Sequence, residues 1–132
     1  VGSEMCIRDR NFLIAEDNGI NLDMLKELLK EEGAACDCAK NGMAAVDLFR
    51  HSKKGQYDLI FMDVQMPDMD GYEATRAIRQ MKHPDAKDIP IVAMTANAFS
   101  NDVKAAFDCG MNAHLAKPVN IDRIKDIVAN FT

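Results

Sequence analysis

The sequence has no apolar run that approaches the ~20 residues needed to cross a membrane. It also has no excess of basic residues, because 16 lysines and arginines stand against 21 acidic residues, for a net charge of −5. Domains that hold nucleic acid by bulk electrostatics carry the opposite balance. We therefore expect this domain to contact neither a membrane nor nucleic acid.

Cysteine is scarce, and no histidine is spaced to complete a zinc site with the four cysteines that are present. Cys36 and Cys38 lie two residues apart in a predicted strand, where they share a face and cannot easily form a disulfide with each other. We interpret the cysteines as small apolar residues of a protein in a reducing compartment, and we expect a cytoplasmic location.

Linkers, internal repeats and low-complexity segments are also missing from the sequence. With 132 residues, 48% of them hydrophobic and 28% charged, the chain suits one globular domain that buries roughly two-thirds of its unfolded surface. Residues 1–10 show no periodicity and are expected to be a non-native or disordered leader. The domain itself is predicted over residues 11–132.

Apolar strands and amphipathic helices alternate five times along this domain. Strands are predicted at 11–15, 34–39, 59–62, 89–94 and 112–116. Helices are predicted at 19–32, 42–51 and 99–109, and after the capping residues Asp70 and Asn120. Such alternation predicts an α/β fold with a parallel, doubly wound sheet that carries helices on both faces.

Polar side chains follow the predicted strands where the strands end: Glu16 and Asp17, then Asp63, Thr95 and Lys117. The carboxyl ends of parallel strands meet at one edge of a sheet, so these groups are expected to converge. Carboxylates about 4 Å apart repel by about 4 kcal/mol at an effective dielectric constant near 20, and therefore require a cation. Oxygen ligands of this kind suit Mg²⁺, with Mn²⁺ as the alternative ion. Carboxylate, metal, lysine and hydroxyl together indicate phosphoryl transfer.

Four segments carry a resemblance to a known family: residues 15–18 (AEDN), 62–71 (MDVQMPDMDG), 94–96 (MTA) and 116–118 (AKP). On these segments the chain resembles a response-regulator receiver domain of two-component signalling, over residues 11–132. The residues in these segments are most similar to those of receivers carried on hybrid histidine kinases. The resemblance implies a flavodoxin-like (βα)5 fold with strand order 2-1-3-4-5.

The resemblance also implies the role of each site residue. Asp63 is the phosphoacceptor, whose carboxylate attacks a phosphohistidine and becomes an acyl phosphate. Asp17, Asp63 and the Gln65 backbone carbonyl bind Mg²⁺ directly, and Glu16 helps through water. Lys117 contacts the phosphoryl oxygens, and the peptide bond that joins it to the next residue is often cis in the family.

A switch is implied at two positions. Thr95 hydrogen-bonds the phosphoryl group and draws the following loop inward. His114 stands where the family often has a tyrosine or phenylalanine that rotates with this change. An imidazole can rotate as well, and it adds a pH-sensitive group. Two interpretations of His114 therefore stay open: a switch residue, or a half-buried residue that only fills space.

The implied partner is a histidine kinase or a histidine phosphotransfer domain, with the receiver a monomer or weak homodimer that modifies only itself and is not otherwise an enzyme. A phosphorylation-independent pseudo-receiver is the alternative. A dehalogenase-like phosphatase would need an aspartate at Gln65, and a flavin or nucleotide module would need a Gly-rich loop where Glu16 and Asp17 stand.

The helix predicted over residues 19–32 has more apolar residues than one buried stripe needs. Its periodic positions are Ile20, Met24, Leu25, Leu28 and Leu29, and Leu22 lies well round the helix from the first two. Two interpretations stay open: a generously buried helix, or a docking surface beside the acidic site for a four-helix histidine phosphotransfer partner.

Overall fold

A computed structural model describes residues 7–96 and 100–131. Its strands are β1 (Asn11–Ala15), β2 (Ala35–Ala39), β3 (Leu59–Asp63), β4 (Ile91–Thr95) and β5 (Ala113–Ala116). Its helices are α2 (Gly19–Glu31), α3 (Gly42–Arg50), α4 (Gly71–Gln80), α5 (Ser100–Cys109) and α6 (Ile121–Phe131). The strands form one parallel sheet in the order β2-β1-β3-β4-β5, so the predicted fold class and strand order are confirmed.

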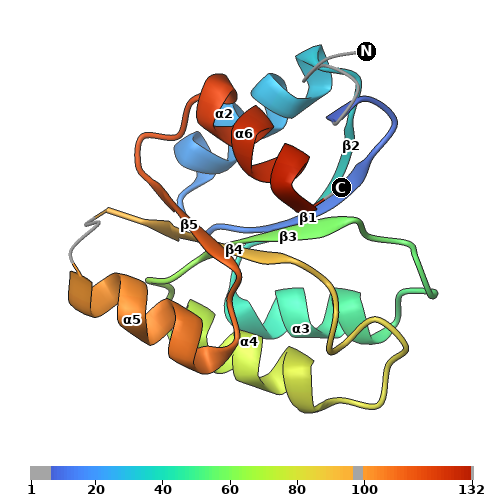
Figure 1. Ribbon diagram of the computed structural model, residues 1–132, viewed down its shortest axis with the longest axis vertical. Helices are drawn as coiled ribbons and strands as arrows, with labels where there is room; N and C mark the ends of the chain where they lie inside the picture. The colour runs from blue at the N-terminus through green and yellow to red at the C-terminus, as the bar shows by residue number, and fades with distance from the viewer. Residues whose placement is uncertain (1–6, 97–99, 132) are drawn as a thin grey trace.

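Three layers make up the molecule, with α2 and α6 on one face of the sheet and α3, α4 and α5 on the other (Figure 1). The central strand β3 is buried along its whole length, as its continuous apolar run predicts. Leu59 and Phe61 enter the core beneath α2 and α6, whereas Ile60 and Met62 enter the core beneath the other three helices. Because of this alternation, β3 contributes side chains to the cores on both faces of the sheet and ends in Asp63.

Side-chain caps start four of the helices at the predicted residues. Asn18, Asn41, Asp70 and Asn120 each accept a backbone N–H from three residues further on, at 2.7–3.0 Å. Each cap lies just beyond the carboxyl end of a strand or in the loop that follows it. The caps therefore fix how the chain turns at the edge of the sheet where the site lies.

The orientation of α2 differs from the periodic set predicted for it. Leu22, Leu25 and Leu29 face the core, while Ile20 is 74% exposed and Met24 is 50% exposed. The helix offers two overlapping apolar stripes, and the sheet can cover only one of them. The covered stripe includes Leu22, and Ile20 and Met24 are left on the surface beside the acidic edge.

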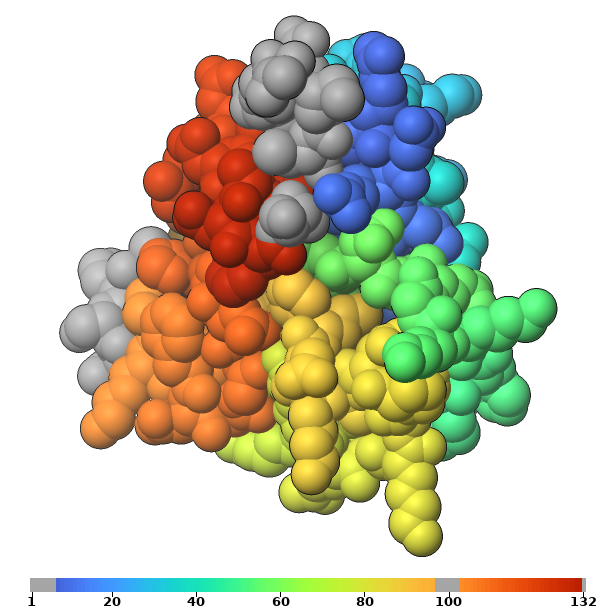
Figure 2. Space-filling view, turned by 45° about the vertical axis from the view of Figure 1, so that its right-hand side comes forward, coloured from blue at the N-terminus to red at the C-terminus, as the bar shows by residue number. Residues whose placement is uncertain are grey.

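At the opposite edge of the sheet, the loops before β3 and β4 lie side by side, green and yellow in Figure 2. The Gly55 N–H donates to Asp85 Oδ2 at 2.7 Å, and His83 Nε2 lies 2.8 Å from the Ser52 carbonyl oxygen. The His83 ring also packs on Phe49, with centroids 4.3 Å apart. These contacts brace the end of the molecule remote from the site.

The predicted leader falls mostly on residues 1–6, which lie outside the described residues. Ile7 is fully buried in the core beneath α2 and α6. The Asp9 N–H donates to the Gly33 carbonyl, and the Ala35 N–H donates to the Arg10 carbonyl. In the part of the chain that the structure describes, no helix is both long and apolar enough to cross a membrane.

Candidate functional site

The site lies at the carboxyl edge of the sheet. Glu16 directly follows β1, Asp63 and Thr95 are the last residues of β3 and β4, and Lys117 directly follows β5. In the strand register Asp63 is opposite Met94, and Thr95 is opposite the last residue of β5. The parallel sheet thus brings together residues as far apart in the sequence as Glu16 and Lys117.

Three carboxylates form the acidic part of the site. One oxygen each of Glu16, Asp17 and Asp63 lies within 4.8 Å of the others. Glu16 and Asp63 are each only 2% exposed, whereas Asp17 is exposed to solvent. Hard oxygen donors around a point that is open on one side fit Mg²⁺, which binds through one or two carboxylates and keeps several waters.

Lys117 closes the cluster from the β5 side. Its Nζ lies 2.9 Å from Glu16 Oε2 and 3.1 Å from Asp63 Oδ2. Burial would lower the pKa of Lys117, but its bonds to the two carboxylates outweigh burial and raise it. Its backbone N–H donates to the Thr95 carbonyl at 2.8 Å, so the main chain fixes where this side chain starts.

Asp63 is the carboxyl whose ionisation the site most resists. Burial, followed by its hydrogen bond to Glu16, raises the pKa of Asp63 to about 7, against the opposing effects of the Gln65 N–H and Lys117. Burial also raises the pKa of Glu16, but the bonds from Asp63, Lys117 and the Asn18 N–H outweigh it and leave that pKa below its ordinary value. Without a metal, the pair therefore favours the protonated form of Asp63 up to higher pH than usual, and a cation would compete with that proton.

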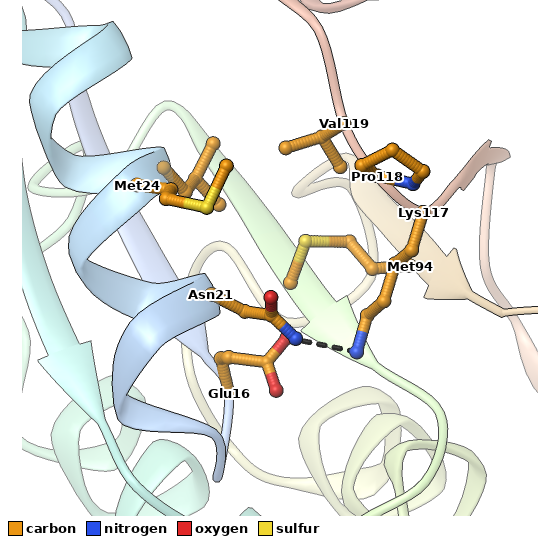
Figure 3. Close-up of a pocket in the computed structure, with 8 residues that line it drawn as sticks. Glu16, Asn21, Met24, Met94, Lys117, Pro118 and Val119 are labelled. Carbon is orange, nitrogen blue, oxygen red and sulfur yellow. Dashed lines mark ion pairs between the residues drawn. The ribbon is translucent and has the colours of Figure 1, made fainter.

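A small pocket opens beside the cluster, between the start of α2 and the segment that follows β5 (Figure 3). Met24 of α2 faces Pro118 and Val119 across it, and Leu25 also lines it. The Lys117 side chain extends along one wall to its ion pair with Glu16. The Lys117–Pro118 peptide is cis, as the resemblance implied.

The remaining predicted site residues lie around this cluster. The exposed Gln65 donates its N–H to Asp63 Oδ1 at 3.1 Å, and its carbonyl as a metal ligand stays a prediction. Thr95 is 4% exposed at the end of β4. His114 is half-buried on β5 opposite Ala93, and its part in switching stays a prediction.

One feature of the site was not predicted, namely that Asn18 anchors Glu16. The Asn18 backbone N–H donates to Glu16 Oε1 at 3.1 Å, while its side chain caps α2. The capping role could be read from the sequence. The backbone bond to Glu16 depends on how the loop folds back, and no sequence signal marks it.

Comparison with known proteins identifies relatives over nearly the whole chain. Residues 12–129 match the family model described as the response regulator receiver domain. The chain is 42% identical to hybrid signal transduction histidine kinase B of Dictyostelium discoideum, over 85% of this chain and 6% of that protein. It is 39% identical to probable histidine kinase 2 of Oryza sativa subsp. japonica, over 88% of this chain and 12% of that protein. The chain therefore spans only a small part of the length of these relatives.

Solved structures agree with this assignment. The receiver domain of sensor histidine kinase PA1611 from Pseudomonas aeruginosa, with a magnesium ion in its active-site cleft, aligns with a TM-score of 0.83 and 32% identity over 93% of this chain and 97% of that one. The receiver domain of Ssk1 from Saccharomyces cerevisiae, solved with the phosphotransfer protein Ypd1, aligns with a TM-score of 0.81 and 32% identity over 94% and 89% of the two chains. The strand order, the acidic edge and these relatives lead to one conclusion: the chain belongs to the response-regulator receiver domains of two-component signalling.

Proposed function

We propose that this receiver accepts a phosphoryl group on Asp63 from a phosphohistidine, in a reaction that depends on Mg²⁺. The observation that carries the proposal is the position of Asp63. Its buried carboxyl ends the central strand and contacts Lys117, and two further acids each place an oxygen within 4.8 Å of one of its own. A buried carboxyl with a raised pKa between charged partners in such a place is typical of a functional group.

The chemistry follows from the groups around Asp63. Its ionised carboxylate attacks the phosphorus, the P–N bond to the donor imidazole breaks, and the electron pair of that bond leaves with the imidazole. Lys117 is placed to donate to the phosphoryl oxygens, and the Gln65 N–H orients the attacking carboxylate. When bound, Mg²⁺ would offset the charge on the transferring group. Asp17, Asp63 and the Gln65 backbone carbonyl are the groups that would hold it directly, and Glu16 would help through water. Thr95 and His114 are the proposed switch.

Incubation with acetyl phosphate tests the proposal directly. Intact mass should show the gain of one phosphoryl group in the presence of Mg²⁺, and no gain after chelation or in Asp63→Asn. The variant is a matched control because an asparagine amide keeps the size of the aspartate and is neutral like its protonated form, but cannot accept a phosphoryl group. An equal gain in Asp63→Asn would reject the acceptor assignment, and no gain in any condition would favour the pseudo-receiver.

We further propose a histidine phosphotransfer domain as the partner, docked on α2. The exposed Ile20 and Met24 lie beside the acidic edge, and Met24 continues into a groove formed with Leu28, Val119 and Ile121. The structural relative Ssk1 was solved bound to the phosphotransfer protein Ypd1. Apolar surface of this kind, next to the reacting carboxyl, suits a helical partner that must bring a histidine to it.

Ile20→Ala and Met24→Ala test this docking surface. Each should slow transfer from a phosphorylated phosphotransfer domain by about five- to tenfold, because exposed apolar anchors are lost. Uptake from acetyl phosphate should stay unchanged, and the free energy of unfolding should move by no more than ~1 kcal/mol. Leu25→Ala is the contrasting variant, since Leu25 is buried and should lose about 2–4 kcal/mol of stability. A large loss of stability in Ile20→Ala with unchanged transfer would refute the docking role.

The proposal gives the domain no external substrate: it catalyses only its own phosphorylation and dephosphorylation, as a monomer or weak homodimer. We place it in the cytoplasm, which is supported by the free thiols of the three cysteines within the described residues.

A further inference from the structure

Glu16 is the acid of the cluster whose two oxygens are both held by the chain itself. Oε1 accepts the Asn18 N–H at 3.1 Å, and Oε2 accepts the Lys117 ammonium at 2.9 Å. The Glu16 side chain is almost fully buried, and Figure 3 shows how its ion pair with Lys117 joins the loop after β1 to the segment after β5. A carboxylate held in this way has little freedom to turn toward an incoming ion.

Asp17 differs from Glu16 although it is the next residue in the chain. It is exposed, and its carboxylate oxygen lies in the same cluster as those of Glu16 and Asp63. An ion that arrives from solvent with its waters meets Asp17 first. The two adjacent acids therefore differ in exposure and in bonding, which suits them to different roles.

Lys117 needs such a support because its ammonium ends a flexible four-carbon chain. Fixing a long side chain in one geometry costs rotamer entropy. Here one end is fixed by the backbone bond to Thr95, and the other end lies between Glu16 and Asp63. Asp63 is the group that changes during the reaction, so Glu16 is the partner that stays constant.

We propose that Glu16 is a positioning residue: anchored by Asn18, its buried carboxylate holds the Lys117 ammonium beside Asp63, while Asp17 and Asp63 supply most of the metal affinity. The effect on phosphoryl uptake rests on the proposed function, whereas the effects on Lys117 and on metal binding do not.

The test compares E16Q with D17N in the full chain. In metal-free protein, the ¹⁵N-detected ammonium signal of Lys117 should broaden or vanish in E16Q and persist in D17N. Calorimetric titration with Mg²⁺ should show an affinity within about threefold of wild type for E16Q and at least about tenfold weaker for D17N. At saturating Mg²⁺, E16Q should take up phosphate from acetyl phosphate about ten- to a hundredfold more slowly, because a misplaced ammonium stabilises the transferring group poorly.

A double-mutant cycle guards against indirect effects of the buried substitution. If Glu16 acts through Lys117, E16Q combined with K117Q should take up phosphate no more slowly than K117Q alone. A loss of Mg²⁺ affinity in E16Q equal to that in D17N, with the Lys117 signal unchanged, would overturn the inference. If no variant or wild type is phosphorylated, the proposed function fails, and the Lys117 signal and the Mg²⁺ affinities still decide the positioning role.

Discussion

Gly71→Ala is expected to lower the free energy of unfolding by about 3 kcal/mol or more, at the upper end of the cost of overpacking. A Cβ at this position would lie 2.3 Å from the Asp63 carbonyl oxygen and 2.9 Å from Val64 Cα. Both are backbone atoms, so no rotamer change can relieve the clash. The start of α4 would have to move away from the end of β3, which carries the proposed phosphoacceptor.

Gly19→Ala is the matched control, because Gly19 likewise begins a helix at the carboxyl edge and a Cβ there meets nothing within 4 Å. Removing this glycine should leave stability unchanged or raise it by up to about 1 kcal/mol. Urea denaturation of both variants measures the difference. A Gly71→Ala protein within 1 kcal/mol of wild type would mean that α4 can move away from Asp63 without cost.

The close approach at Gly71 explains how much of the site the sequence could reveal. A proline and a glycine within eight residues of an acidic strand end indicate a turn, and the turn was predicted. That the same glycine also lets a helix start against the backbone of Asp63 is a tertiary fact. Sequence spacing shows which residues leave the strands, but it does not show how closely the next helix packs on them.

The fold itself was well determined by local signals. Apolar runs such as the one ending in Asp63 alternate with capped helices, and the rules for parallel connections allow few arrangements of such elements. The convergence of Glu16, Asp63 and Lys117 then follows from the sheet, and two ion pairs join these three residues. Strand ends that carry charge are informative because burying charge without a partner is costly.

Two features were beyond the sequence, for the same physical reason. Ile20 and Leu22 are both apolar, and only the position of α2 on the sheet decides that Leu22 is buried and Ile20 exposed. Likewise Glu16 and Asp17 are both acids, and only the fold of the loop decides which one Lys117 and Asn18 hold. Tertiary contacts therefore decide which of two chemically similar neighbours is buried or bonded and which is exposed.

Asp63 should make the metal-free protein less stable as the pH rises. Its folded-state pKa of about 7 lies above its ordinary value of 3.8, so the folded protein binds the extra proton. The resulting stability is complete below the ordinary pKa and is lost as the pH rises through about 7. Between about pH 5 and pH 8 the free energy of unfolding should fall by about 2–3 kcal/mol. Glu16 acts in the opposite sense, because its folded-state pKa is lowered, but its contribution is largely complete by about pH 5.

Asp63→Asn should remove this pH dependence and leave the metal-free variant about 2–4 kcal/mol more stable than wild type at about pH 8. Its amide is neutral, as the protonated carboxyl is, and it offers a donor for Glu16 in place of the carboxyl proton. Mg²⁺ should stabilise wild type more at about pH 8 than at about pH 5, because the ion requires the ionised carboxylate that the metal-free fold disfavours. Asp126→Asn, an exposed acid on α6, should behave as wild type in both series. Equal pH dependence in wild type and Asp63→Asn would assign the effect to another group. It would also refute the view that Asp63 exchanges a proton for a cation.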